Sequence, residues 1–233
     1  MKKVLFIILI AFTSFNMQAQ KNIEKEAPFS NQIIDVDLDF ASSIEITTWD
    51  QPTIQVKAVI KTQDPKYTEL FDIKFKDDNH TLFITSNSKD VFKAYQDDHD
   101  LPDIGVIYSQ GLDHQFNYQL MVPKDVKLNI SSITGDISSD YVNGEISVDL
   151  VSGNIQIEEF DGNLNLDTVN GRIELPGNDS SMVAKTVVGK IQTTPELAVV
   201  RKEKFIGQEI SLKNENAQNS MRLNTVNGYI VIN

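Results

Sequence analysis

The amino-acid sequence predicts an all-β protein in which an N-terminal β-sheet domain is continuous with a short, two-sided, right-handed parallel β-helix of about 18 residues per coil. Three observations lead to this fold class. Glycine recurs every nine residues through part of the chain, apolar and polar residues alternate between the glycines, and one nine-residue string occurs twice with few changes. The 233 residues are enough to bury a substantial core.

The glycine series predicts the corners of the repeat. Glycines stand nine apart at 135, 144, 153, 162 and 171, and gaps of eighteen lead on to 189 and 207. They lie in strings such as Val-Asn-Gly and Val-Ser-Gly, and glycine adopts positive φ angles that other residues avoid, so each string predicts a tight turn. The frame is stricter around Gly153 than around Gly162, and we expect Gly162 to tolerate alanine better.

The residues between the glycines predict strands rather than helices. The second residue after each glycine is apolar, and its neighbours are polar; we expect these apolar residues to form one buried column: Ile137, Ile146, Ile155, Leu164 and Ile173. This period of two is typical of a strand with one buried face, and helical spacing does not fit it. Apolar residues two positions before the glycines, such as Val151 and Val169, belong to the same pattern.

Strands at nine-residue spacing could form an antiparallel meander or a solenoid. The regularity at eighteen residues favours the solenoid, whose sides would each stack at about 4.8 Å. The strings DTVNGRIEL at 167–175 and NTVNGYIVI at 224–232 are then two copies of one rung, separated by an insertion around KNENAQNS.

Three regions follow from these patterns: a signal peptide at 1–19, an N-terminal β-sheet region at 20–130, and the β-helix repeat region at 131–233. The N-terminal region alternates in strings such as TIQVKAVI without repeating, and TQDPKYTELF has room for one helical turn. Its polar stretch at 87–115 is interpreted as a long acidic loop.

The first nineteen residues have the layout of a secretory signal peptide. Lys2 and Lys3 precede an apolar run from Val4 to Phe12, and Ala19 offers a cleavage site. The run is shorter than the ~20 residues that span a bilayer. We therefore expect an exported protein, in the periplasm or at the cell surface. The chain contains no cysteine, so its fold cannot depend on disulfides.

The repeats resemble the bacterial putative-adhesin family of β-strand repeat domains of unknown function. The similarity is carried by ITGDISSDYVNGEISVDLVSGNIQI, by IEITTWDQPTIQV with its Trp-Asp turn, and by YQLMVPKDVKLNISSITGDI with its Val-Pro entry. It covers most of residues 30–233. The resemblance implies an exported β-helix with adhesion or envelope roles, and it supplies no catalytic residues.

The sequence gives little support for an enzyme. It has no Gly-x-Ser-x-Gly elbow and no phosphate-binding loop, and its histidines lie in polar connecting stretches at 80, 99 and 114. We therefore assign no enzymatic activity, no cofactor, and no catalytic, cofactor-binding or metal-binding residue.

Two acidic groups were weighed as cation sites. The first is the set Asp97, Asp98, His99, Asp100, Asp103 and His114, whose spacing matches no known metal site, so a solvated loop is favoured. The second is an acidic column in which Asp140 lies over Glu158 and Asp149 over Asp167; its side chains are expected to be solvated.

The net charge of −12 becomes −14 once Lys2 and Lys3 leave with the signal peptide. Such an acidic surface repels nucleic acid and anionic membranes. The predicted function is that of an exported, non-enzymatic structural or interaction protein resembling adhesins, with a protein or glycan partner at the cell envelope. The alternative is a periplasmic module that binds or senses a small ligand or cation.

Self-association is also predicted. The string YIVIN at 229–233 has no charged side chain, and an unpaired strand edge of that kind is a template for pairing. We expect weak self-association through this edge. Tyr229 lies on the polar side of the rung and is the one aromatic residue that we consider as a candidate for contact with a sugar; the others are expected in the core or the sheet.

Overall fold

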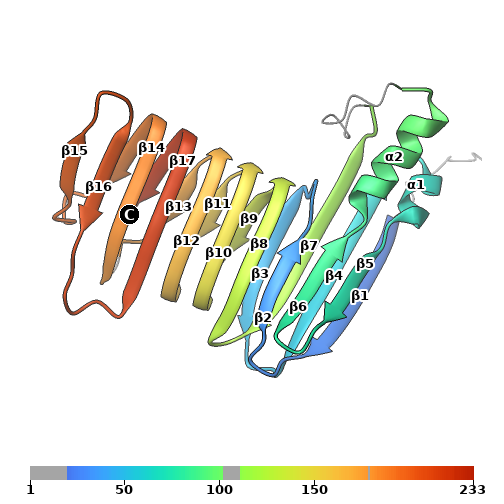
Figure 1. Cartoon of the computed structure of the whole chain (residues 1–233), viewed down its shortest axis with the longest axis horizontal. Helices are drawn as coiled ribbons and strands as arrows, with labels where there is room; N and C mark the ends of the chain where they lie inside the picture. The colour runs from blue at the N-terminus through green and yellow to red at the C-terminus, as the bar shows by residue number, and fades with distance from the viewer. Residues whose placement is uncertain (1–19, 102–110, 178) are drawn as a thin grey trace, which may run out of the picture.

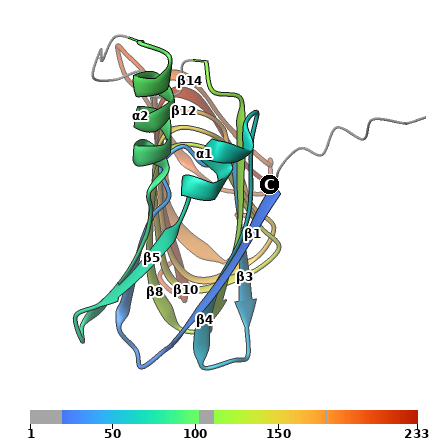
Figure 2. The ribbon, with the colours of Figure 1, turned by 90° about the vertical axis from the view of Figure 1, so that its right-hand side faces the viewer.

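The computed structural model describes residues 20–101, 111–177 and 179–233, and the predicted signal peptide at 1–19 lies outside them. In the described part of the chain, seventeen strands join one sheet and two short helices lie at one end, so the all-β prediction is confirmed (Figure 1). The strands form two walls that face each other across the core, as the end-on view in Figure 2 shows.

The first wall is a long row of strands that is parallel from β6 to β14 and antiparallel at its margins. Its spatial order is β5 (Ile73–Asp77), β6 (Thr81–Ser86), β2 (Ile33–Asp37), β8 (Val126–Thr134), β10 (Val142–Ser152), β12 (Phe160–Asn170), the first half of β17 (Asn219–Ile232), the first half of β14 (Ser180–Thr193), β16 (Gln208–Leu212) and β15 (Val200–Glu203).

The second wall closes the core from the other side. Its order is β1 (Gln20–Pro28), β4 (Thr53–Thr62), β7 (His114–Pro123), β3 (Ser43–Trp49), β9 (Asp136–Ser139), β11 (Ile155–Ile157), β13 (Ile173–Leu175) and then the second halves of β17 and β14. Ile155 pairs in parallel with Ile137 on one side and Ile173 on the other. The parallel direction of these pairs excludes the antiparallel meander for this region.

The N-terminal region shares this sheet rather than forming a separate one. Ile34 of β2 pairs in parallel with Leu128 of β8, and Ile44 of β3 with Ile137 of β9. Helix α1 (Pro65–Leu70) is the helical turn expected in this region; the Asp64 side chain caps it by accepting from the Lys66 backbone N–H.

The prediction of a loop throughout 87–115 was wrong, because Ser88–Asp98 form helix α2. The helix buries Val91, Phe92 and Tyr95, and its remaining side chains are mostly polar and charged. The stretch is acidic over most of its length, so its composition did not indicate a helix with one apolar face. Residues 102–110 of the predicted loop lie outside the described residues.

The predicted buried column is confirmed. Side chains of the second residue after each glycine are at most 3% exposed: Ile137, Ile146, Ile155, Leu164 and Ile173. The residues two positions before the glycines divide into two groups. Val142 is buried, whereas Val151 and Val169 are exposed at 48% and 40% because the chain turns a corner at these positions.

The two copies of the repeated string are direct neighbours in space. Asp167 pairs with Asn224 and Ile173 with Ile230, so the string at 224–232 lies on top of the string at 167–175. On its other side β17 pairs with β14, where Ile191 is the partner of Ile230. The predicted sticky edge at 229–233 was therefore wrong, because β17 lies inside the sheet and Ile230 is completely buried.

A column of glycines allows the rungs to stack at one corner. Its spatial order is Gly135, Gly153, Gly171, Gly228 and Gly189, and a Cβ on each of the last four would overlap with the carbonyl oxygen of the glycine before it. At Gly171 and Gly228 this close approach, rather than a left-handed φ, excludes a side chain. The opposite corner is equally tight: a Cβ on Gly162 would overlap with the Gly144 carbonyl, so the expected tolerance of Gly162 for alanine has no basis in the structure.

Two equally buried threonines beside the glycine column, one with a hydrogen-bonded hydroxyl and one without, allow the contribution of that hydrogen bond to stability to be measured. Thr168 Oγ1 donates to the Gly153 carbonyl at 3.1 Å, whereas the equally buried Thr225 hydroxyl has no partner among the described residues. Thr168→Val is expected to lower the free energy of unfolding by about 1 kcal/mol. Thr225→Val is expected to leave it unchanged or raise it, because an unsatisfied buried hydroxyl is removed. Urea denaturation of both variants measures this, and an equal loss in the two would contradict it.

Candidate functional site

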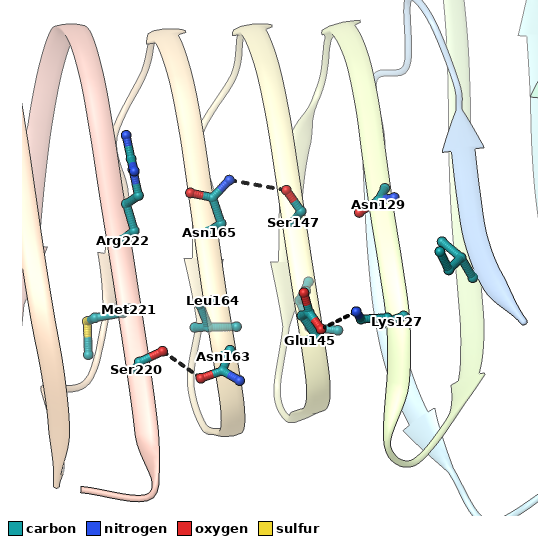
Figure 3. A pocket seen from close by; sticks show the side chains of 12 residues that line it. Lys127, Asn129, Glu145, Ser147, Asn163, Leu164, Asn165, Ser220, Met221 and Arg222 are labelled. Atoms are coloured by element: carbon teal, nitrogen blue, oxygen red, sulfur yellow. Dashed lines mark hydrogen bonds and ion pairs between the residues drawn. The ribbon is translucent and has the colours of Figure 1, made fainter. Parts of the chain in front are cut away.

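The outer face of the first wall carries a groove of about 480 Å³ (Figure 3). Every second residue of β8, β10, β12 and β17 points outward, because strand side chains alternate between faces. The outward residues that line the groove are Lys127, Asn129, Glu145, Ser147, Asn163, Asn165, Ser220 and Arg222, with Ile33 of β2 at one end. Most are short and polar, so the groove offers many hydrogen-bonding groups and little apolar surface.

Two rows of side chains cross the groove from rung to rung. In the lower row of Figure 3, Lys127 pairs with Glu145 at 2.9 Å and Ser220 Oγ donates to Asn163 Oδ1 at 2.5 Å. The polar side chains of the lower row are therefore already bonded to one another.

Fewer side chains of the upper row bond to one another. Asn165 Nδ2 donates to Ser147 Oγ at 3.2 Å, and Asn129 and Arg222 stand at the two ends of the row (Figure 3). Within the described part of the chain, neither Asn129 nor Arg222 makes a side-chain hydrogen bond or ion pair. The upper row thus presents amide and guanidinium groups that can receive a ligand.

The groove continues across β17 onto β14 and β16. A second hollow of about 440 Å³ shares Met221 and Arg222 with the first, and its exposed lining includes Val183, Lys185 and Lys213. The lining therefore changes along the wall, from polar side chains with the Lys127–Glu145 ion pair at β8 and β10 to lysines and apolar side chains at β14 and β16.

The predicted acidic set does not converge on one point. Asp98, at the end of α2, accepts from Lys66 Nζ at 2.5 Å and from the Tyr67 hydroxyl at 2.8 Å. The Lys66 ammonium and then the Tyr67 hydroxyl lower the pKa of Asp98, whereas desolvation followed by the hydrogen bond to Asp98 raises the pKa of Tyr67 to about 12. Asp97 faces Lys93 at 3.5 Å, and Asp103 lies outside the described residues.

The histidines are held by local contacts. His99 Nδ1 lies 2.8 Å from the Tyr95 carbonyl, and its ring stacks on Tyr95. His114 Nδ1 lies 3.0 Å from the Leu112 carbonyl, and His80 is exposed in the turn between β5 and β6. Over the described residues, no three histidine, aspartate or glutamate side chains are close enough to hold a metal ion together.

The structure pairs two carboxylates of the predicted acidic column and gives one of them an amide hydrogen bond. Asp149 is the register partner of Asp167. Asp167 Oδ1 accepts from Asn224 Nδ2 at 2.6 Å, so the adjoining rung supplies an amide rather than a third carboxylate. Tyr229 is half exposed on the second wall, where Lys190 is its register partner.

Sequence reasoning identified the polar face but missed the groove. The alternation indicates that Ser147 and Asn165 point outward. A hollow on that face depends on the twist of many strands, which local alternation does not predict. The position of Arg222 beside Asn165 depends on β17 lying next to β12. The repeated string at 167–175 and 224–232 was the signal for that neighbourhood.

In the described part of the chain, neither helix is both long enough and apolar enough to cross a lipid bilayer.

No family model matches the chain, and no curated protein matches it. A solved structure described as a putative cell adhesion protein from Clostridium sporogenes is similar with a TM-score of 0.53 and 11% identity, covering 91% of this chain and 99% of that one. A putative adhesin from Bacteroides fragilis has a TM-score of 0.28 and 11% identity, covering 91% and 97%. A putative lipid binding protein from Parabacteroides distasonis has a TM-score of 0.30 and 12% identity, covering 74% and 70%. The first likeness shows the fold, which this chain shares with the clostridial protein; the other two scores are too low to support an argument.

Proposed function

We propose that this protein is an exported, non-enzymatic interaction protein of the cell envelope, of the adhesin-like kind, and that its first wall binds an extended polar ligand. The observation that carries the proposal is the groove that crosses at least four rungs and is lined by amide, hydroxyl and guanidinium groups. The repeat motifs resemble the putative-adhesin family, and the fold likeness to a clostridial protein described as a putative cell adhesion protein supports the same kind of role.

Export is part of this proposal and rests on residues 1–19, whose charged start and short apolar run have the layout of a signal peptide. Cell fractionation with and without surface proteolysis tests it and separates a periplasmic from a surface location. Recovery of the chain in the cytoplasm would contradict the proposal.

We also propose that the parallel rungs form a short right-handed β-helix of about eighteen residues per coil. Val142 pairs with Phe160 and Ile155 with Ile173, each eighteen residues apart, and the glycine column lies at one corner. Right-handedness is supported by the general rule that crossovers between parallel strands have this hand.

The chemistry of the groove favours a glycan chain as the ligand. Sugar hydroxyls both donate and accept hydrogen bonds, and so do the side chains of Asn129, Ser147 and Asn165. The guanidinium of Arg222, unpaired among the described residues, suits a uronic acid or another carboxylate on the chain. No observation on the described residues specifically favours the alternative of a small-ligand or cation module.

The double variant Asn165→Ala with Arg222→Ala is expected to lower affinity for an oligosaccharide by about tenfold or more, because two groups of the upper row are lost. The mature chain is first applied to an array of neutral and uronic-acid-containing oligosaccharides, and the best binder is then titrated by calorimetry. Gln156→Ala, an exposed change on the second wall, is the control and should bind normally. Failure to bind any sugar on the array, or an equal loss in the control, would contradict a glycan ligand in this groove.

A further inference from the structure

An exposed apolar corner runs along the molecule beside the glycine column. Val151, Val169, Val226 and Val187 stand at equivalent positions of successive rungs, as the register pairs on either side of each show. All four are between 40% and 48% exposed. Because strands stack at about 4.8 Å, these four valines form a continuous apolar ridge rather than scattered surface residues.

The ridge ends at the hairpin that joins β15 to β16. In its turn, residues 204–207, Phe205 is fully exposed and Ile206 is 63% exposed. Gly207 has a φ of +84° and lies against the Thr186 carbonyl and Val187, which places the turn beside the end of the ridge. Val188, 59% exposed, continues the apolar surface there. The apolar tip is defined here as Val187, Val188, Phe205 and Ile206.

The apolar tip is held by bonds that also protect the sheet edge behind it. Arg201 donates through Nη1 to the Ile191 carbonyl at 3.3 Å and through Nη2 to Thr193 Oγ1 at 2.9 Å. Gln208 Oε1 accepts from the Ile191 backbone N–H at 2.9 Å. These contacts satisfy the backbone N–H and carbonyl of Ile191, which the outer edge of the second half of β14 would otherwise expose.

The charge of the molecule is divided between its two ends. Residues 172–233 contain eight basic and six acidic side chains, a net charge of +2, whereas the whole chain carries −12. The difference, −14, is carried by residues 1–171. In Figure 1 the hairpin lies at the opposite end of the elongated molecule from helices α1 and α2. The end that carries the apolar tip is therefore the basic end of an acidic protein.

Lysines surround the apolar tip. Lys204 begins the turn and Lys202 precedes it; both approach the carboxylate of Glu209, as does Lys185 at 3.9 Å. The hydrogen bond from Lys204 is the main reason that the pKa of Glu209 is lowered. With Glu203 also counted, the three lysines and two glutamates around the turn carry a net charge of +1, so a small surplus of positive charge lies beside the exposed phenyl ring.

We propose that this end of the molecule docks on an anionic lipid surface, with Phe205 and Ile206 inserted among the upper acyl chains and Lys202 and Lys204 at the headgroups. Apolar side chains at the centre and long basic side chains around them are the composition that binds at a membrane interface. A protruding ring needs a complementary hollow in a protein partner, whereas a fluid bilayer deforms around it. In the mature chain residues 20–171 carry a net charge of −16, which the same surface repels, so the molecule stands end-on.

This proposal goes beyond the groove function and replaces the expectation, drawn from the net charge alone, that the whole surface repels anionic membranes. The upper-row residues Asn129, Ser147, Asn165 and Arg222 take no part in it. The two proposals are therefore tested by separate variants and separate probes.

The test is sedimentation of the mature chain with vesicles of phosphatidylglycerol and phosphatidylethanolamine, and with vesicles of phosphatidylcholine alone. Binding is expected to the anionic vesicles, to be weak with phosphatidylcholine, and to fall in about 0.5 M salt. The double variant Phe205→Ser with Ile206→Ser is expected to bind about tenfold less. Leu70→Ser, which alters an exposed apolar residue at the acidic end, is the control and should bind as the parent does.

A second measurement reports insertion directly. The chain has no cysteine, so Phe205→Cys and Leu70→Cys each give one site for an environment-sensitive fluorophore. With anionic vesicles the emission should shift to the blue at position 205 and stay unchanged at position 70. Absence of vesicle binding, binding that survives the serine double variant, or no shift at position 205 would overturn the proposal. A soluble oligomer of the parent that the serine double variant abolishes would assign the tip to protein contacts and would also overturn it.

Discussion

Gly171→Ala is expected to lower the free energy of unfolding by about 3 kcal/mol, a large fraction of the 5–15 kcal/mol that stabilises a typical domain. A Cβ at this position would overlap with the backbone carbonyl of Gly153, and backbone atoms cannot rotate away as a side chain can. Two rungs would have to separate at the corner. The φ of Gly171 lies outside the left-handed region, so the loss would measure the close approach of two backbones.

Urea denaturation gives the comparison. Val169→Ala, two residues away in the same corner and exposed, should change the stability by no more than about 0.5 kcal/mol. A similar loss in the two variants would show that the rungs do not stack through the glycine column.

A chain that ends at Gln218 is expected to lose its folded structure beyond β13. The removed strand β17 separates β12 and β13 from β14, and its Leu223, Ile230 and Ile232 are completely buried. Each such side chain contributes about 1.5–3 kcal/mol of transfer free energy. Their combined loss approaches the whole stability of a domain, and two apolar strand faces would become exposed.

Limited proteolysis with mass spectrometry locates the loss. The control is a variant in which residues 200–207 are replaced by a short Gly-Ser linker, which removes the edge strand β15 and leaves β17 in place. We expect protection of residues 126–193 in the control and cleavage after about residue 175 in the shortened chain. Equal protection of the two proteins would contradict an interior position for β17.

Local patterns in the sequence were sufficient to predict which residues are buried in the repeats. Ile155 lies two residues after a glycine inside an alternating strand, and both features depend only on near neighbours in the chain. The spatial order of the rungs was not predicted, because β17 enters between two earlier strands and the repeat period does not indicate such an insertion; the repeated string at 167–175 and 224–232 was the one signal of it. The error about the edge at 229–233 follows from this.

The surface features were less predictable for a related reason. Val169 fits the apolar pattern, but a corner turns its side chain to solvent. Helix α2 was not predicted because charged residues such as Asp97 and Asp98 dominate its composition, whereas its buried apolar side chains are only Val91, Phe92 and Tyr95. Arg222 reaches the groove only through the pairing of β17 with β12. Each of these depends on contacts between segments that are distant in the chain.

The position of β17 has a consequence for biosynthesis. A ribosome makes β12, β13 and β14 before β17, yet β14 can take its native place only when β17 has arrived to stand between them. Growth of the sheet one rung at a time, in the order of synthesis, is therefore blocked at β13. Docking must wait for a contact that spans dozens of residues, and contacts of that kind slow folding. Such a delay fits the export proposed above, because a stack that cannot close during synthesis would not obstruct passage across a membrane.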